Sequence, residues 1–363
     1  MKKKRLSIFL LSILFFAGIQ TVEPAYSNAH TTVILSSSGE VVYTTTPLKG
    51  LNYGWNDGGG ANIHDWISTK WDETKVRSDF GEMQKMGVTL TRTYIAPTSY
   101  TNWDWAWTKG YQGFNEYIVN VDKLLQIARE YGMKIIFNIL WADGAFHWDA
   151  LNRPAQRLSY LNMMRDLALR YKNETVIYSF NLFNEPYTMI EINMAGAEGS
   201  PSEASITPEI MHNFLKDCYN TIKANDPNRL VSFEESSSWG LDTLTSNFDK
   251  YFELIDDCVD YYQFDVYRDA ASIIANGLES YIYRKNELTK PIVFGEIGAS
   301  GYHFLDPHYA AEAIDIIWKQ SNELADKYRI QAVLPWSFVD DNIIDSITHE
   351  WKEGAYVIQS WSS

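Results

Sequence analysis

Two glutamates, far apart in the chain, could together perform acid–base and nucleophilic chemistry. Glu185 follows the apolar run in YSFNLFNEPY, and Glu296 lies near the end of the apolar run in PIVFGEIGASG. A polar group at the tip of a buried strand needs either partners or a function, because burying it uncompensated is costly. Two carboxyl groups about 5 to 5.5 Å apart are what retaining hydrolysis of a glycosidic bond requires, one protonating the departing oxygen and the other attacking the anomeric carbon.

The elements that must position these glutamates follow from an alternation of β-rich runs and amphipathic segments of helical length. In residues 115–132, apolar side chains recur at three- and four-residue steps and Gly132 provides a C-terminal stop. In residues 208–226, Thr207 is the expected N-cap and Pro208 the first helical residue. The predicted strands are 48–53, 88–95, 133–140, 176–183, 229–234, 259–266, 291–297 and 330–337.

This alternation predicts parallel strands joined by right-handed crossovers, and the fold class is therefore α/β, a (β/α)8 TIM barrel. The alternative is an open doubly wound sheet. It is disfavoured because GLNYGWNDGGG, after the first strand, is not a phosphate-binding glycine loop that opens a helix. Barrel chemistry takes place at the C-terminal ends of the strands, so both glutamates should face one mouth.

The chain is expected to comprise a leader, an arm and one catalytic domain. Residues 1–29 combine a basic start, a short apolar run and small residues before a cleavage position, which is typical of a secretion signal peptide. The apolar run is shorter than the roughly 20 residues of a spanning helix. Residues 30–46 should form an N-terminal strand or arm, and 47–363 the barrel. The predicted location is secreted, either extracellular or periplasmic.

Composition narrows the range of partners. A net charge of -15 disfavours nucleic acid and anionic membranes, because like charges repel, and it suits a neutral substrate. No later segment is apolar enough to span a membrane, so no membrane association is expected after signal cleavage, and we expect a monomer. Export permits a bond between Cys218 and Cys258 without requiring one.

In the motifs LFNEP and VFGEIG the chain resembles glycoside hydrolase family 5, which belongs to a clan of retaining barrel enzymes. The resemblance extends from about residue 48 to residue 340. It implies that Glu185 is the acid/base and Glu296 the nucleophile. It also implies that Asn184 donates a hydrogen bond to the sugar 2-hydroxyl.

These roles require different protonation states for the two glutamates. Arg92, in TLTRTYIAP at the end of the second strand, occupies a position from which family members send an arginine toward the nucleophile, and should hold Glu296 ionised. Glu185 should keep its proton until Glu296 is esterified, and then activate water. The structural alternatives are a surface ion pair for Arg92, a solvated residue at a strand end for Glu185, and a buried carboxylate paired with an arginine for Glu296.

The sixth strand departs from the family pattern. YYQFDVYRD places Tyr267 as expected, but Asp265 stands where the family usually has histidine. A carboxyl group there can donate a hydrogen bond only if it is protonated, and otherwise Asp265 could bind a sugar hydroxyl. An ionised Asp265 near the pair would disfavour ionisation of Glu185 and extend activity toward alkaline pH.

Aromatic residues predict a sugar-binding groove. Trp336, in VLPWSF, matches the family's flat platform under the sugar next to the cleaved bond, although a core tryptophan is the alternative. Trp141 and Trp148 follow the third strand. Glu234 and Glu235 end the fifth strand and could contact substrate, Glu235 being our candidate binding residue. Trp103, Trp105 and Trp107 alternate after the second strand.

No metal and no cofactor is expected, because His64, Asp143 and His147 show no ligand spacing and retaining glycosidases need none. Residues 114–144 and the pairing of TRTYI with FEESSSWG look most like the endo-β-1,4-mannanases, and this is the favoured function. The main alternative is an endo-β-1,4-glucanase. A non-catalytic carbohydrate-binding barrel would have lost a glutamate, and a barrel acting on a phosphorylated metabolite would show a glycine-rich phosphate site.

Overall fold

The structure, a computed structural model, covers the barrel and its helices in detail. It describes residues 32–35, 41–44, 46–54, 67, 71–95, 114–139, 151, 154–186, 207–236, 254–282, 285–299, 306–338, 343–345 and 348–361. The predicted signal peptide lies outside the described residues, as do His64, Asp143 and His147. So do Trp141 and the other tryptophans of the predicted groove walls at 103, 105, 107 and 148.

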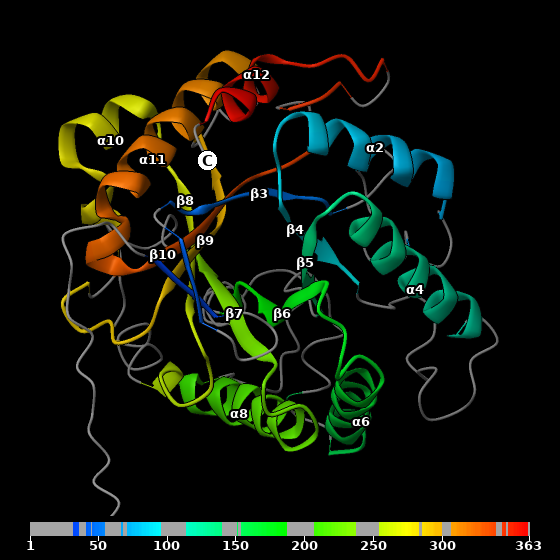
Figure 1. Ribbon diagram of the computed structural model, residues 1–363. Coiled ribbons are helices and arrows are strands. Elements are labelled where there is room, and N and C mark those ends of the chain that lie inside the picture. Colours follow the sequence, from blue (N-terminus) through cyan, green and yellow to red (C-terminus); the bar gives the residue numbers. More distant parts are fainter. Residues whose placement is uncertain are drawn as a thin grey trace, which may run out of the picture.

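Eight parallel strands close into a barrel in the order β10-β3-β4-β5-β6-β7-β8-β9 (Figure 1). This confirms the predicted fold class, and each of the eight predicted runs overlaps one barrel strand. The strands are β3 (Leu48–Asn52), β4 (Leu90–Tyr94), β5 (Lys134–Asn138), β6 (Ile177–Asn184), β7 (Leu230–Ser236), β8 (Tyr262–Tyr267), β9 (Ile292–Gly298) and β10 (Ile330–Pro335).

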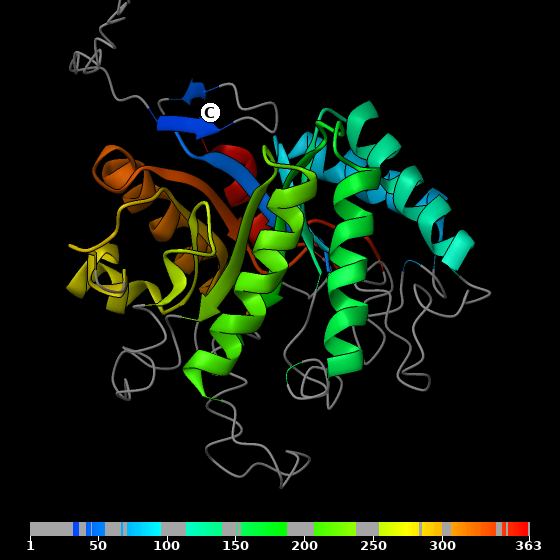
Figure 2. The same cartoon turned by 90° about the horizontal axis from the view of Figure 1, so that it is seen from below.

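Helices surround the barrel, as Figures 1 and 2 show from two directions. Two predicted helix ends are confirmed. Thr207 accepts a hydrogen bond from the Ile210 amide at the start of α8, and Gly132 follows α4 with a φ of 71°. The helices are α2 (Glu73–Lys85), α4 (Phe114–Glu130), α6 (Pro154–Arg170), α8 (Pro208–Asn225), α10 (Ala270–Asn276), η1 (Leu278–Tyr281), α11 (Pro307–Tyr328) and α12 (Glu353–Ser360).

Two separate apolar clusters divide the inside of the barrel from its outside. The larger cluster packs the helices against the outer face of the strands. The smaller cluster comes mainly from the early residues of the strands, and consists of Leu90, Ile136, Tyr178, Leu230, Tyr261, Val293, Ala332 and Leu334. Because this cluster closes the N-terminal half of the barrel with side chains, the polar residues that follow on the same strands gather at the C-terminal half.

Two short strands precede the barrel. β1 (Thr32–Leu35) and β2 (Val41–Thr44) pair antiparallel, within the span predicted to form a strand or arm, and lie at one end of the barrel (Figure 2). Cys218 and Cys258 are both buried free thiols, which resolves the open question about a bond between them. Among the described residues, no helix has the length and apolar character needed to cross a membrane.

Candidate active site

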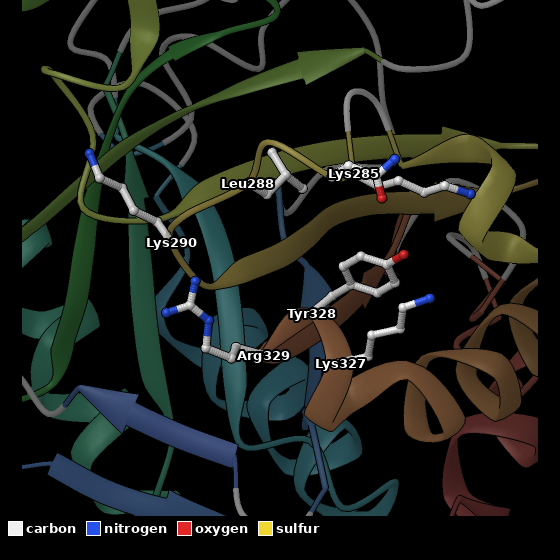
Figure 3. A pocket seen from close by; sticks show the side chains of 7 residues that line it. Lys285, Leu288, Lys290, Lys327, Tyr328 and Arg329 are labelled. Carbon is white, nitrogen blue, oxygen red and sulfur yellow. The ribbon is translucent and has the colours of Figure 1, made fainter. Parts of the chain in front are cut away.

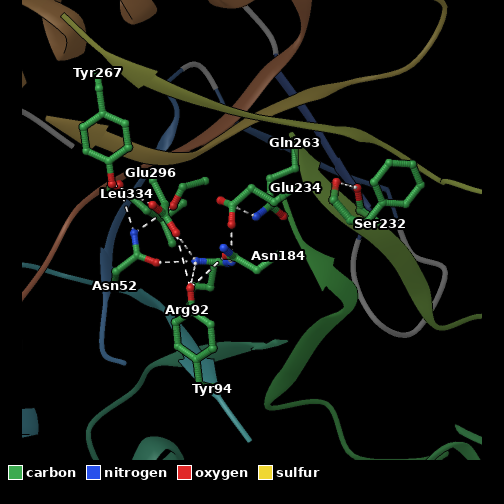
Figure 4. A network of polar contacts seen from close by, with 12 residues as sticks. Asn52, Arg92, Tyr94, Asn184, Ser232, Glu234, Gln263, Tyr267, Glu296 and Leu334 are labelled. Carbon is green, nitrogen blue, oxygen red and sulfur yellow. Dashed lines mark hydrogen bonds and ion pairs between the residues drawn. The ribbon is translucent and has the colours of Figure 1, made fainter. Parts of the chain in front are cut away.

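Glu296 lies on β9 and is held at both carboxylate oxygens. Arg92 Nη1 donates to Oε1 at 2.7 Å, and the Tyr94 hydroxyl donates to the same oxygen at 3.3 Å. The Tyr267 hydroxyl donates to Oε2 at 2.6 Å. The residue is 5% exposed. Three donors from two strands therefore fix the carboxylate in one orientation, with little freedom to rotate (Figure 4).

Arg92 on β4 is the centre of this network and is fully buried. Besides Glu296, its guanidinium donates to Asn52 Oδ1 at 3.0 Å and to Asn184 Oδ1, and it forms an ion pair with Glu234. Asn52 in turn donates to the Gly295 carbonyl at 2.7 Å, which ties β3 to β9. Arg92 therefore contacts the nucleophile candidate, and it is buried rather than part of a surface ion pair.

Asn184, the last residue of β6, is oriented by two donors. Its Oδ1 accepts from Arg92 and, at 2.8 Å, from the Tyr94 hydroxyl. With the oxygen engaged on the protein side, the amide nitrogen is the group left to donate to a ligand. This orientation fits the role that the family resemblance implied for Asn184.

Glu234 on β7 belongs to this network, whereas the sequence predicted for it only a possible contact with substrate at the end of a strand. It is fully buried, paired with Arg92, and accepts a hydrogen bond from Gln263 Nε2 at 2.9 Å. Alternation along LVSFEES could have identified it, because Val231 and Phe233 pack in the outer cluster and Glu234 therefore faces inward. Glu235, the residue chosen from sequence, is 2% exposed, and its contact with substrate stays a prediction.

Asp265 on β8 is fully buried beside Glu234 and Glu296. Burial raises the pKa of its carboxyl group well above the usual value, and the neighbouring Glu234 and Glu296 raise it further. In the strand register Asp265 is paired with Glu296, so the two residues lie at the same level of the barrel. Its direct binding of a sugar hydroxyl stays a prediction.

The ionisation of Glu296 is governed by more groups than the sequence analysis considered. Burial raises the pKa of Glu296 well above its usual value, Glu234 and Glu185 add to the effect, and Arg92 and Tyr267 oppose it. Arg92 thus favours the ionised form of Glu296, as expected, but it opposes burial and Glu234 without offsetting them. The physical reason is that Arg92 is shared with a second buried carboxylate, Glu234.

Glu185 directly follows β6 in a left-handed backbone conformation, with a φ of 47°. For a residue other than glycine this conformation costs about 1–2 kcal/mol, and such strain is concentrated at functional sites. The side chain is half-buried, and its charge acts on Asp265, Tyr267 and Glu296. The two glutamates therefore lie at the same end of the barrel, the nucleophile candidate enclosed and the acid/base candidate closer to solvent.

Trp336 follows β10 next to this network. Its ring meets the Tyr94 ring edge-on at 6.2 Å and 88°, and it is 9% exposed. Tyr94, which the sequence analysis did not select, thus joins the candidate platform to Arg92 and Glu296. The stacking of a sugar on Trp336 stays a prediction.

Among the described residues, two groups of side chains bring possible cation ligands close together. Glu234, Asp265 and Glu296 bring carboxylate oxygens within 4.8 Å of one another, but Arg92 already contacts two of them. A second group, His212, Asp257 and Cys258, has its aspartate paired with Lys216. In each group a cationic side chain of the protein thus already pairs with a carboxylate.

A cavity of about 190 Å³ lies away from these carboxyl groups, and Figure 3 shows it from close by. It is lined by Lys285, Asn286, Leu288, Lys290, Lys327, Tyr328 and Arg329. Lys290 and Arg329 immediately precede β9 and β10, so the cavity belongs to the N-terminal end of the barrel. Its basic lining and position separate it from the candidate active site.

A barrel with an arginine-held glutamate on β9 and a second glutamate after β6 is typical of enzymes that cleave glycosidic bonds. The comparison with known families points to the same class. The chain belongs to glycosyl hydrolase family 5: the family model, described as cellulase, matches residues 55–338. The family resemblance read from the sequence is confirmed.

Individual relatives agree with this assignment. A probable mannan endo-1,4-beta-mannosidase C of Aspergillus terreus is 26% identical over 137 residues, which are 34% of this chain and 33% of that protein. The match thus spans about a third of the curated relative's length.

Solved structures share the fold. The endo-1,4-beta-mannanase of Rhizomucor miehei has a TM-score of 0.59 at 16% identity, covering 82% of this chain and 87% of that one. An exo-beta-1,4-mannosidase of an Opitutaceae bacterium has a TM-score of 0.63 at 15% identity, covering 92% and 61%.

Proposed function

We propose that this protein is a secreted retaining glycoside hydrolase that cleaves β-1,4-linked mannan internally. The observation that carries the proposal is the carboxylate of Glu296, held by Arg92, Tyr94 and Tyr267 at the barrel mouth where the Glu185 charge reaches it. In a family 5 barrel, two such carboxyl groups suit retaining hydrolysis.

In the first step, a Glu296 oxygen forms a bond to the anomeric carbon while the glycosidic carbon–oxygen bond breaks. Glu185 gives its proton to the departing oxygen, so that the leaving sugar departs as a neutral alcohol. Arg92 and Tyr267 aim the two Glu296 oxygens, which reduces the entropy lost on reaching the transition state.

In the second step, water attacks the same carbon from the face that the leaving group has vacated. Glu185, now a carboxylate, takes a proton from this water as the ester to Glu296 breaks. The Asn184 amide nitrogen, which points away from its two protein donors, is placed to hydrogen-bond the sugar 2-hydroxyl. Net retention of anomeric configuration follows from the two displacements.

Mannan as the substrate is supported by the names of the relatives, which are mannan-cleaving enzymes of both endo and exo type. An endo-β-1,4-glucanase is the second candidate, favoured by the description of the family model as cellulase. Secretion is supported by the leader-like residues 1–29. A hydrolysis screen with mannan, glucomannan, cellulose derivatives and xylan separates the two candidates, and product lengths separate internal from terminal cleavage.

The two glutamates are tested by replacement. Glu296→Ala and Glu185→Ala should each lower kcat on the order of 10⁴-fold or more, as removing a catalytic group commonly does. Azide should rescue Glu296→Ala to a product of inverted configuration. In Glu185→Ala an activated leaving group should restore the first step, and azide should give a retained product.

The matched control is Glu279→Ala, at the opposite end of the barrel, which should keep full activity. Following the product anomer by NMR early in wild-type hydrolysis provides an independent check. First appearance of the inverted anomer, or identical responses of the two alanine variants to azide, would refute the assignment of roles.

A further inference from the structure

The region behind Glu296 holds more negative than positive groups. Glu234, Asp265 and Glu296 each place an oxygen within 4.8 Å of the others. Glu234, Asp265 and Arg92 are 0% exposed, and Glu296 is 5% exposed. Among the described residues, Arg92 is the cation that contacts this group. Three ionised carboxyl groups would leave two buried negative charges uncompensated, at a cost of several kcal/mol each. One carboxyl group must therefore carry a proton.

The contacts indicate which group holds it. Glu234 pairs with Arg92 and accepts from Gln263, and Glu296 accepts from Arg92 and two tyrosines, so both are solvated as anions by the protein. Asp265 instead places a carboxyl oxygen within 4.8 Å of those of Glu234 and Glu296, while Arg92 makes its ion pairs with the two glutamates. Two carboxyl groups can share a hydrogen bond only when one of them is protonated, because an ionised carboxylate has no donor.

We propose that Asp265 is a neutral acid at neutral pH that donates its proton to Glu234, and that Glu234 is a positioning residue that anchors Arg92 from the side opposite Glu296. The catalytic consequence rests on the proposed function, whereas the protonation of the pair does not. The pair explains how an aspartate can occupy the place of the family's histidine: a neutral carboxylic acid, like an imidazole, can donate a hydrogen bond.

A glycine makes room for this arrangement. A Cβ atom at Gly295 would lie 2.0 Å from Glu234 Oε1 and 2.4 Å from Gln263 Nε2. A side chain at this position would force Glu234 and Gln263 to shift. The residue that precedes the nucleophile candidate on β9 is thus small because a carboxylate from β7 passes beside it.

The titratable groups around Asp265 act mostly in one direction. Burial raises its pKa, and the carboxylates Glu234, Glu296 and Glu185 raise it further. Arg92 and Tyr94 face this group from β4, which is not adjacent to β8. Glu235 lies on the adjacent strand β7, Tyr267 on β8 itself, and Tyr261 just before β8. Arg92 is the one of these groups that is a cation, and it is already in contact with Glu234 and Glu296.

Infrared difference spectroscopy tests the proton directly. The wild-type-minus-Asp265→Asn spectrum at pH 7 should contain the carbonyl band of a protonated carboxylic acid, shifted by exchange into heavy water. The control Asp166→Asn, at an exposed ion pair with Arg165, should show loss of an ionised carboxylate instead. If Asp265→Asn also loses a carboxylate band, the proposal is overturned. This measurement needs no substrate, so it gives its answer even if the protein hydrolyses none of the tested glycans.

The pH dependence of kcat/KM tests the positioning role. Glu234→Gln removes an anion next to Glu296, so the acidic limb should move to lower pH by about one unit, while kcat falls because Arg92 loses an anchor. Asp265→Asn replaces a neutral acid by a neutral amide, so its acidic limb should not move. Glu279→Gln is the matched control and should match the wild type. An acidic limb that moves equally in Asp265→Asn and Glu234→Gln would show that Asp265 is ionised.

Discussion

Arg92 and Arg229 are the two largest fully buried side chains of the barrel, and they lie at its opposite ends. Arg229 directly precedes β7, at the N-terminal face. Its guanidinium donates to the carbonyls of Ile177 at 2.6 Å and Tyr171 at 2.7 Å, and to Asp226 at 3.1 Å. Arg92, inside the C-terminal half, donates to side chains alone: two carboxylates, two amides and a tyrosine.

The two environments change the arginines in opposite directions. Burial lowers the pKa of Arg229, and Asp226 only partly compensates. Burial alone would also lower the pKa of Arg92, but Glu234, Tyr94 and Glu296 raise it well above the usual value. The difference teaches that a buried arginine bonded to backbone carbonyls joins elements together, whereas one surrounded by excess carboxylates sets the charge of a reactive site.

The largest effect is expected from Arg92→Lys. A single ammonium cannot contact Glu296, Glu234 and Asn184 at once, so kcat/KM should fall on the order of 10³-fold, about 4 kcal/mol of transition-state stabilisation. Steady-state kinetics on folded, active-site-titrated enzyme measures this. A loss of stability with unchanged kcat/KM would erase the distinction between the two arginines.

Arg229→Lys should have the opposite signature. It leaves carbonyl oxygens of the loop between α6 and β6 without donors, and the free energy of unfolding should decrease by about 3 kcal/mol. Urea denaturation provides the measurement, and kcat/KM per folded molecule should remain at the wild-type value. Reduced catalysis without destabilisation would show that the N-terminal face contributes to the reaction.

Asp79 of α2 extends the comparison of buried charged groups to a carboxyl group outside the barrel. Burial raises its pKa to about 6, although it accepts a hydrogen bond from Tyr53 at 2.7 Å. Between its ordinary value of 3.8 and about 6, the folded state binds more protons than the unfolded state. The free energy of unfolding therefore decreases as pH rises through this window.

Asp79→Asn keeps an acceptor for Tyr53 and removes the charge. Above pH 6 the variant should be more stable than the wild type by about 3 kcal/mol, and the difference should vanish below pH 4. Thermal or urea unfolding across pH 4–8 measures the difference, with catalysis unchanged. A variant that is less stable at pH 8 would contradict the expected sign.

The smallest effect concerns the start of α8. Thr207 Oγ1 accepts from the Ile210 amide at 3.4 Å, and Thr207→Ala should lower the free energy of unfolding by about 1 kcal/mol. Thr207→Ser, which keeps the hydroxyl, is the control and should lie close to the wild type. Equal losses in both variants would indicate that the methyl group, not the cap, stabilises the helix.

The sequence by itself determined the barrel and placed its strands to within about three residues at either end. Strand runs alternating with amphipathic helices leave few topologies, and signals such as Thr207 and Gly132 act locally, through backbone geometry that neighbouring residues dictate. Glu185 and Glu296 could be chosen because motifs of a few residues carry them to strand ends, and Arg92 because the family pattern has an arginine on this strand, where it proves to be the central residue of β4.

Only the tertiary structure decided which groups share Arg92. Glu234 and Asp265 come from different strands, and their proximity depends on barrel closure and register, which pairs Asp265 with Glu296 and Asn184 with Glu234. No local pattern encodes such distances, since electrostatic interaction depends on separation in space and on burial. The electrostatic surroundings of Glu296 follow from this, because carboxylates that are far apart in the sequence share one buried guanidinium.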